Sequence, residues 1–330
     1  MEIDTITGNA AARCMSPIVK GTDPSFLLSD RKETHVTYKD TIIDDLLVGS
    51  IDLHVHVGPD PSHRAGGTRR YDVAQVGEMA KAAGQPAVAC KSHQQVTASL
   101  ASLASRMVSG ITLLGGITLN KTVGGLNPHA VRMAGELGAR ILWFPTHHAA
   151  HHNSTLVEGG RGDDKGIYVL DAEGKLLPEV HEILDLVLRY NMLLGTGHVS
   201  FPEASAIVKA AREKGIERII ANHPLSKNSC RYTVAEAKQL ADLGATVELT
   251  FVSMMPFTRA KTSTPQETVE AIREIGPERC IISTDFGAYA TPPPPEGLRM
   301  FIATLLNHGM APEDVDYMAR RNPRQLAGLP

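Results

Sequence analysis

Several absences in this sequence narrow the classes of protein to which it can belong. No apolar run approaches the roughly 18 residues that a membrane-spanning helix requires. The four cysteines (Cys14, Cys90, Cys230 and Cys280) are scattered, with no Cys-x-x-Cys pair and no secretory leader, which predicts a reduced, cytoplasmic setting. The formal net charge of -3 offers no basic surface, so we expect neither nucleic acid nor a membrane as a partner.

What is present is the composition of an ordinary soluble globular enzyme. Hydrophobic residues make up 42% and charged residues 21% of the 330 residues, enough to bury a sizeable core in one large α/β domain or two smaller ones. The 14 histidines exceed what we expect for this length. More than half of them fall at or just beyond predicted strand ends, which decides where to search for a site.

From about Val48 onward, short apolar runs alternate with amphipathic segments. The predicted strands are Ser50–Val57, Pro86–Lys91, Ile111–Leu119, Arg140–Pro145, Leu193–His198, Arg218–Asn222, Thr246–Phe251 and Cys280–Thr284. The predicted helices include Asp72–Ala83, Thr97–Met107, Pro128–Leu137, Pro178–Tyr190, Pro202–Lys214, Val234–Leu243, Pro265–Ile275 and Gly297–Asn307. Strands rich in Val, Ile and Leu, each followed by a helix, predict a parallel sheet and a single α/β (β/α)8 TIM-type barrel. An open, doubly wound sheet is the alternative.

Two segments depart from this rhythm. Residues 1–47 are polar at first and contain one short helical pattern, Thr41–Leu47, and we expect them to form an N-terminal arm. Residues 48–330 would then form the barrel domain, with a C-terminal helix that packs beneath it. The long loop His147–Leu177 follows the fourth strand and contains a predicted hairpin at Ile167–Lys175. Long loops at a barrel's C-terminal face commonly act as lids or substrate walls.

The most informative motif is His54-Val55-His56, at the end of the first predicted strand. Alternate side chains of a strand share a face, so the two imidazoles are expected on one side, about 7 Å apart. Two neutral imidazoles so placed can share one divalent metal at about 2.0–2.1 Å from each. A turn follows directly at Gly58–Pro61, which places the pair at the mouth where barrels keep their chemistry. Two packed histidines without a metal are the alternative.

Polar side chains close most of the other predicted strands. They are Lys91 and His93 after the second, Asn120 after the third, His147 after the fourth, His198 after the fifth, His223 after the sixth and Asp285 after the eighth. In a closed barrel these ends converge on one pocket. Several histidines with one carboxylate form a ligand set that suits Zn²⁺ and tolerates Mn²⁺ or Fe²⁺.

This order of residues resembles the amidohydrolase superfamily, over roughly Val48 to Asn307. Within that superfamily the chain looks closest to a poorly characterised bacterial branch. The local sequence forms shared with that branch are Asp52–Asp60, Lys91–His93, Gly124–Pro128, Thr196–His198 and Ser283–Asp285.

The resemblance implies a role for each of the matching residues. His54, His56 and His198 would hold a metal and leave one position open for water. Asp285 would contact the metal or its water, act as general base and return the proton to the leaving group. His223 would hold a second metal or polarise the carbonyl oxygen of the substrate.

The chain departs from the superfamily pattern after the fourth strand. Two-metal members often bridge their metals there with a carboxylated lysine or a glutamate, whereas this chain reads Pro145–His148. Lys91 is the obvious substitute, because a lysine that closes an apolar strand is desolvated and its neutral amine could take up CO₂ as a carbamate ligand. The alternative is an ammonium that pairs with Asp285 or a substrate anion. The number of metal ions, one or two, therefore stays open.

Other polar residues carry weaker signals. The cluster His147, His148, His151 and His152 looks like a metal tract, but in a long loop it is equally a solvated stretch or a pocket wall. We take His147, His93, Asn120 and Arg64 as candidates for substrate binding. The apolar stretch Phe251–Phe257 favours either an uncharged or aromatic substrate portion or a subunit interface.

Together these residues predict a metal-dependent hydrolase that cleaves an amide, imide or lactam C–N bond of a small molecule with metal-activated water. Ester or lactone hydrolysis would use the same parts. The alternative is a mononuclear metal-dependent decarboxylase or hydratase of the same superfamily, which the missing lysine after the fourth strand favours. A non-enzymatic metal-binding barrel is the second alternative, against which the converging ligands argue. We expect a homo-oligomer, the default for barrels of this size.

Overall fold

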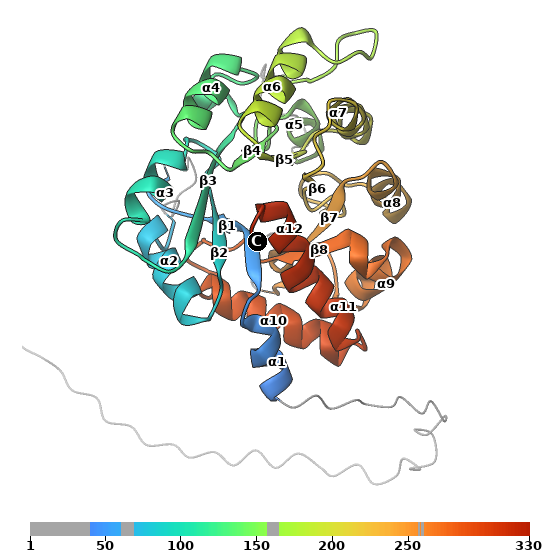
Figure 1. Cartoon of the computed structure of the whole chain (residues 1–330). Coiled ribbons are helices and arrows are strands. Elements are labelled where there is room, and N and C mark those ends of the chain that lie inside the picture. The colour runs from blue at the N-terminus through green and yellow to red at the C-terminus, as the bar shows by residue number, and fades with distance from the viewer. Residues whose placement is uncertain (1–39, 61–68, 157–164, 257, 259–260) are drawn as a thin grey trace, which may run out of the picture. The chain divides into compact units, whose positions relative to one another are not determined.

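In the described part of the chain, the strands form one sheet of eight members, in which each strand pairs in parallel with its neighbours in the sequence (Figure 1). The structure, a computed structural model, describes residues 40–60, 69–156, 165–256, 258 and 261–330. The strands are β1 (Ile51–His56), β2 (Ala87–Lys91), β3 (Thr112–Thr118), β4 (Ile141–Trp143), β5 (Leu193–Gly195), β6 (Ile219–Ala221), β7 (Thr246–Thr250) and β8 (Cys280–Ser283).

Helices alternate with these strands and cover the outside of the sheet (Figure 1). They are α1 (Asp40–Leu47), α2 (Val73–Ala82), α3 (Ala98–Ala104), α4 (Pro128–Glu136), α5 (Ala150–Leu156), α6 (Pro178–Arg189), α7 (Phe201–Glu213), α8 (Val234–Asp242), α9 (Pro265–Ile275), α10 (Pro294–Asn307), α11 (Pro312–Asp316) and α12 (Asn322–Ala327). Their starting points follow local chemistry. Thr264, for example, forms a capping box with Glu267 just before Pro265, the first residue of α9.

The sheet closes between its first and last strands. Val55 forms a parallel bridge with Phe286, the amide of His56 donates to the carbonyl of Phe286 at 2.7 Å, and the amide of Asp285 donates to that of His54 at 2.9 Å. An open, doubly wound sheet would leave these edges apart and would not keep the strands in sequence order. The (β/α)8 barrel predicted from the sequence is therefore confirmed.

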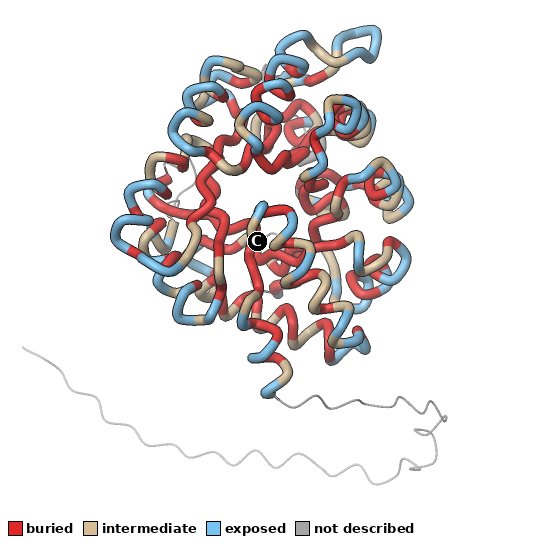
Figure 2. Tube along the Cα trace, in the orientation of Figure 1, coloured by how far each residue is buried: buried red, intermediate tan, exposed pale blue. Residues whose placement is uncertain are grey.

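Strands in a barrel are buried on both faces, and the exposure of this chain shows it: the strand segments are buried and the outward faces of the helices are exposed (Figure 2). At the end of the barrel where the strands begin, Leu326 and Ala327 of α12 pack against interior residues that include Ile51, Ile141 and Ile281. This apolar plug closes one end of the barrel. Any chemistry is therefore restricted to the opposite end, where the strands terminate in polar residues.

Several boundaries differ from the sequence prediction. The strands β4, β5 and β6 are shorter than predicted, because the residues that follow them belong to loops. The helix α10 begins at Pro294, not Gly297, since prolines are tolerated in a first turn that has no intrahelical use for their amides. The long loop after β4 contains the unpredicted helix α5. Its expected hairpin is reduced to a turn closed by a bridge between Leu170 and Leu176.

The large apolar residues of the stretch after β7 belong to the core. Phe251, Met254 and Met255 are buried in the core cluster between β7, β8 and α10, so they neither line the mouth nor offer a surface. Phe257 and Arg64 lie outside the described residues, as does most of the predicted arm. Its end, α1, packs Ile43 into the same core cluster.

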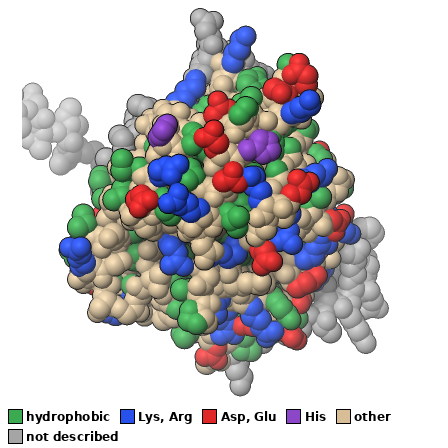
Figure 3. Space-filling model, turned by 45° about the horizontal axis from the view of Figure 1, so that its top comes forward, with side chains coloured by type: hydrophobic (Ala, Val, Ile, Leu, Met, Phe, Trp, Pro, Cys, Tyr) green, Lys and Arg blue, Asp and Glu red, His purple; other side chains and the backbone are tan. Residues whose placement is uncertain are grey.

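The surface carries both signs of charge. Figure 3 shows lysine and arginine side chains interspersed with aspartate and glutamate on the face drawn. In the described part of the chain, every helix is too short or too polar to cross a bilayer.

Candidate functional site

Histidines gather at the C-terminal ends of the barrel strands. Ring contacts with centroids 3.7 to 6.2 Å apart link seven of them into one cluster: His54, His56, His93, His147, His152, His198 and His223. They come from β1 and from the loops after β2, β4, β5 and β6 and from α5. The structure thus brings together every histidine that the sequence assigned to the site and adds His152.

A local irregularity in β1 turns its two histidines into the barrel. The pairing of β1 with β2 shifts register between Asp52 and Val55. Leu53 packs in the barrel interior, whereas Val55 packs outward against α2. Such a bulge re-aims the side chains that follow it. His54 and His56 consequently share one face, as predicted, with ring centroids 5.2 Å apart.

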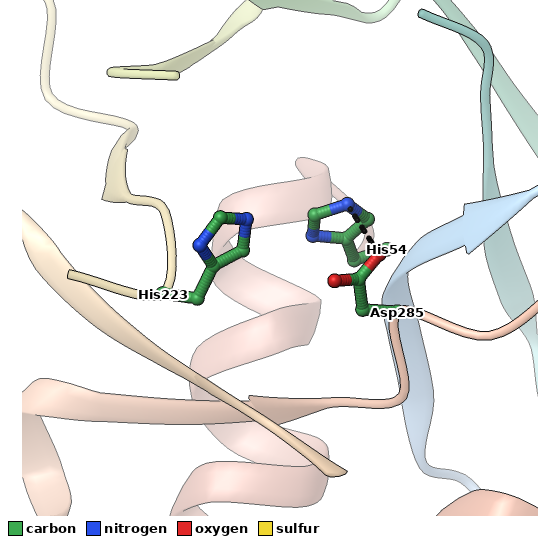
Figure 4. A group of neighbouring side chains, drawn as sticks. All are labelled: His54, His223 and Asp285. Atoms are coloured by element: carbon green, nitrogen blue, oxygen red, sulfur yellow. Dashed lines mark ion pairs between the residues drawn. The ribbon is translucent and has the colours of Figure 1, made fainter. Parts of the chain in front are cut away.

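Asp285 lies between these two histidines. Its Oδ1 is 2.9 Å from Nε2 of His56 and 3.2 Å from Nε2 of His54. One ligand atom each of His54, His223 and Asp285 falls within 4.8 Å of the others, and Figure 4 shows these three side chains facing a common space. The predicted ligands from β1, β6 and β8 therefore converge.

Three observations indicate that the residues of this cluster could bind a divalent metal. Ligands about 2.1 Å from one tetrahedral ion lie about 3.4 Å apart, close to the distances from Asp285 Oδ1 to the two imidazoles. Nε2 of His198 is buried with no hydrogen-bond partner among the described residues, which leaves a ligand position to fill. Burial holds the pKa of His56 and of His198 well below the usual range, so both imidazoles are neutral and able to bind a metal.

Glu248 supports this group, and the sequence prediction missed it. It lies in β7 with no exposed surface, and its Oε1 and Oε2 are both 3.1 Å from Nδ1 of His54. Burial acts to raise the pKa of Glu248, but the neighbouring His54 outweighs it and the pKa falls to about 2. The ionised carboxylate keeps the proton of His54 on Nδ1, so that the Nε2 lone pair faces the site. The sequence did contain a signal for this residue, because a glutamate within an otherwise apolar strand is unusual.

Lys91 ends β2 and is completely buried. Its Nζ lies 2.9 Å from Nε2 of His54 and 5.2 Å from the ring centroid of Trp143. Burial lowers the pKa of Lys91 to about 8, even though Asp285 and Glu248 act to raise it. In the protonated state Lys91 donates to the same lone pair of His54 that a metal would use. A metal and the Lys91 ammonium therefore compete for one atom.

His223 follows β6 in a strained conformation. Its φ is +26° and that of Asp285 is +56°, in a region that residues other than glycine rarely adopt. Nδ1 of His223 lies 3.0 Å from the hydroxyl of Ser229, which can donate or accept. Burial lowers the pKa of His223 to about 4, so the ring is neutral at pH 7. With Ser229 as donor, Nε2 carries the proton; with Ser229 as acceptor, Nε2 is free to bind a metal.

The position of Asp285 depends on a buried contact between the first and last strands. Asp52 accepts hydrogen bonds from the Thr284 hydroxyl at 2.5 Å and from the His54 amide at 3.1 Å. Burial raises the pKa of Asp52 to about 7. On the other side of Asp285, a Cβ on Gly287 would lie 2.0 Å from the carbonyl oxygen of His56. Only glycine permits this close approach of the two chains.

His198 contacts a second histidine that the sequence placed in the solvent or a pocket wall. Nδ1 of His198 is 3.0 Å from Nδ1 of His152, which is buried in α5. One of these two nitrogens must donate and the other accept. If His198 donates, its unpartnered Nε2 is a lone pair available to a metal. This makes His152 a positioning residue for His198.

Replacing His152 with phenylalanine is expected to weaken metal binding by about 10- to 100-fold, the usual effect of losing such an outer partner. His152→Gln, whose amide can still accept from His198, should retain most of the affinity. Competition with a chromogenic chelator would measure both variants. Equal metal affinity in His152→Phe and the wild type, at equal thermal stability, would contradict this role.

The residues that the sequence suggested for substrate binding lie in different environments. His93 and His147 stack with centroids 3.7 Å apart beside His56, at the mouth of the cluster. Asn120 instead uses its whole amide on the scaffold. Nδ2 donates to the His93 carbonyl and to the Thr146 hydroxyl, and Oδ1 accepts from two amides of the loop after β4. Asn120 thus joins loops, and its side-chain amide has its hydrogen bonds taken by the scaffold.

Comparison with known proteins places this site in a family. Residues 49–248 match the model of the family DUF6282, which is described as a family of unknown function. The chain belongs to this family. The DUF6282 match includes all seven clustered histidines and Glu248 but ends before Asp285. No protein with a curated description matches the sequence.

Solved structures show that this DUF6282 member shares the fold of amidohydrolases. An amidohydrolase from Pseudomonas aeruginosa is 16% identical with a TM-score of 0.55, over 87% of this chain and 98% of the other. The probable dipeptidase PvdM from the same organism is 12% identical with a TM-score of 0.60, over 88% and 98%. The 2,6-dihydroxybenzoate decarboxylase from Rhizobium is 13% identical with a TM-score of 0.50, over 85% and 99%. At these sequence identities the similarity establishes the fold alone. The reaction must be argued from the residues of the site.

Proposed function

We propose that this protein is a metal-dependent hydrolase that cleaves an amide, imide or lactam C–N bond of a small molecule. The observation that supports this most directly is the position of Asp285 Oδ1, 2.9 and 3.2 Å from two imidazole nitrogens. His54, His56, His198 and Asp285 would hold the first ion, most simply Zn²⁺, and Lys91 with His223 would hold a second ion if there is one. A divalent cation held there would lower the pKa of a water ligand from about 15.7 toward 7 and polarise a carbonyl oxygen.

The chain's own residues would manage the proton and the developing charge. Burial acts to raise the pKa of Asp285, but His54 and then His56 outweigh it and hold that pKa well below the usual range, so its carboxylate is ionised at neutral pH. It would accept a proton from a water whose own pKa a bound cation lowers. The same carboxyl would return the proton to the departing nitrogen. A neutral His223 with its proton on Nε2 would donate a hydrogen bond to the carbonyl oxygen as negative charge develops there.

A lyase remains the second candidate for one reason in the structure. Among its described residues, the loop after β4 brings His147 into the cluster but no lysine or glutamate, so Lys91 is the lysine that would bridge two ions. If Lys91 stays an ammonium, one ion is held, and its positive charge would favour a carboxylate substrate and loss of CO₂. The fold itself accommodates both reactions, since an amidohydrolase and a decarboxylase share it.

A panel of neutral lactams, cyclic imides and N-acyl compounds, tested beside lactones and aromatic carboxylic acids, would separate the candidates. We expect hydrolysis of at least one C–N compound, loss of about 100-fold or more of that activity after removal of metal with dipicolinate, and recovery with Zn²⁺. Product chromatography and CO₂ release would be followed together. Release of CO₂ without hydrolysis would favour the lyase, and activity that survives complete metal removal would contradict both.

A further inference from the structure

A cavity of about 270 Å³ opens beside the histidine cluster, between the loops after β6 and β7 and the helices α8 and α9. His223 and Glu248, both buried, lie at its inner end. Lys227 and Glu267 line it as well and are exposed, so they mark its outer end. The cavity therefore leads from the surface to a residue of the proposed site. Neither the family match nor the sequence prediction assigns it a role.

The wall of the cavity is apolar with a few hydroxyl groups. Leu249 and Ala271 are buried apolar residues, and Tyr232 contributes its ring because its hydroxyl donates to the carbonyl of Val199. The hydroxyls of Thr250 and Ser253 lie 3.0 Å apart and bond to each other.

One polar group in the wall lacks a partner. The hydroxyl oxygen of Thr262 is buried without a hydrogen-bond partner among the described residues. Leaving such a group unsatisfied is unfavourable, so a ligand that bonds to it would be favoured.

The charge of the lining residues and the volume of the cavity limit which ligands it could bind. Among the described residues that line the cavity, the buried ionisable groups are His223, Glu248 and Tyr232. The Glu248 carboxylate is already bound by His54 and by the Asn222 amide at 3.0 Å. The cation among the described lining residues is Lys227, which is exposed at the outer end, so a buried anion would lie near the Glu248 carboxylate without a cation in the wall beside it, which is unfavourable. An engineered cavity of about 150 Å³ holds benzene, so this one has room for a six-membered ring with a substituent.

We infer that this cavity is the subsite for an uncharged, ring-bearing part of the substrate, with one hydrogen-bonding group near Thr262. The inference rests on the proposed function, because His223 at the inner end is where the reacting carbonyl would lie. It adds to that function the part of the substrate that determines specificity.

The test uses benzamide as the neutral probe, benzoate as its charged counterpart and fluorobenzene as the probe without a hydrogen-bonding group. Binding to the full chain is measured by ligand-observed NMR with dipicolinate present, so that no metal contributes. Ala271→Leu places a larger side chain in the cavity wall. Its matched control is Ala206→Leu, a partly exposed residue of α7 in a separate surface depression.

We expect Ala271→Leu to weaken benzamide binding by about tenfold or more, and Ala206→Leu to change it by less than about twofold. Benzoate should bind the wild type at least about tenfold more weakly than benzamide. If Ala271→Leu does not fold, Thr262→Val serves instead, since it removes the unpartnered hydroxyl at constant shape. It should weaken benzamide by about tenfold and leave fluorobenzene unchanged.

The inference is overturned if benzamide fails to bind the wild type, binds it no better than benzoate, or binds Ala271→Leu and Thr262→Val as well as the wild type. Metal content is determined on the same preparations. A protein that binds benzamide in the cavity but no metal would contradict the proposed hydrolase and leave the cavity's binding role intact. A protein that binds metal but no benzamide would contradict the subsite alone.

Discussion

Replacing Asp285 with asparagine is expected to reduce kcat by about three orders of magnitude, within the range for loss of a general acid–base group. The variant keeps the shape of the side chain but cannot accept a proton and carries no charge between His54 and His56. It should also bind metal more weakly. Turnover on whichever C–N compound the panel identifies, together with elemental analysis, would measure both effects.

The same substitution has a predicted signature in stability. Because the pKa of Asp285 in the folded protein lies below its ordinary value of 3.8, the carboxylate stabilises the fold above that value, and this stability is lost as the pH falls through the folded pKa. In the metal-free protein, Asp285→Asn should therefore lose stability at neutral pH and show a weaker dependence below about pH 4.

The control is Asp185→Asn, on the surface of α6, where Asp185 pairs with Lys214. It removes a carboxylate far from the histidine cluster and should leave kcat, metal content and the acid limb unchanged. A kcat in Asp285→Asn within tenfold of the wild type would remove Asp285 from the chemistry proposed above.

The barrel was predictable because its signals are local. Each strand is a short apolar run, several helices begin at a capping box or a proline, and the polar residues come where the apolar runs end. The pair His54 and His56 illustrates this, since alternation along one strand predicts their shared face without knowledge of any other element. The place of Asp285 followed instead from the predicted topology, since closing a barrel places the end of the eighth strand beside the first.

What sequence reasoning missed depends on contacts between distant segments. Glu248 and His54 are 194 residues apart, and only the closed barrel brings them within 3.1 Å. His152 was read as part of a loop cluster, because the helix α5 that turns it toward His198 has no strong periodic pattern. Asn120 shows the reverse case: its position at a strand end suggested substrate binding, whereas four hydrogen bonds to neighbouring loops use its amide. A residue's place in the chain thus indicated proximity to the site but not its partners.

Lys91→Ala is expected to decide the number of metal ions. Lys91 must be neutral to react with CO₂, and with its pKa at about 8 instead of 10.5 the neutral fraction at pH 7 is about 300-fold greater than for an ordinary lysine. If the carbamate forms, the wild type should hold two equivalents of metal and Lys91→Ala one. Elemental analysis gives the stoichiometry, and a carbamate carbon labelled from ¹³C-bicarbonate gives an NMR signal that the variant lacks.

The pH dependence of stability provides an independent test of the protonation of Lys91. In the metal-free protein, the unfolded chain binds more protons than the folded one between about pH 8 and pH 10.5, so stability should rise with pH across that window. Lys91→Ala should flatten this rise, as measured by urea unfolding at several pH values. Lys214→Ala, which removes a surface lysine paired with Asp185, is the matched control and should keep the slope.

The two measurements together distinguish the reactions. Two equivalents of metal, a carbamate signal and loss of both in Lys91→Ala would support a bridged pair and hydrolysis. One equivalent unaffected by Lys91→Ala would mean that the lysine remains an amine 2.9 Å from His54. In that case its positive charge below about pH 8 would face the substrate, and a decarboxylase that binds a carboxylate there would become the better description of the site.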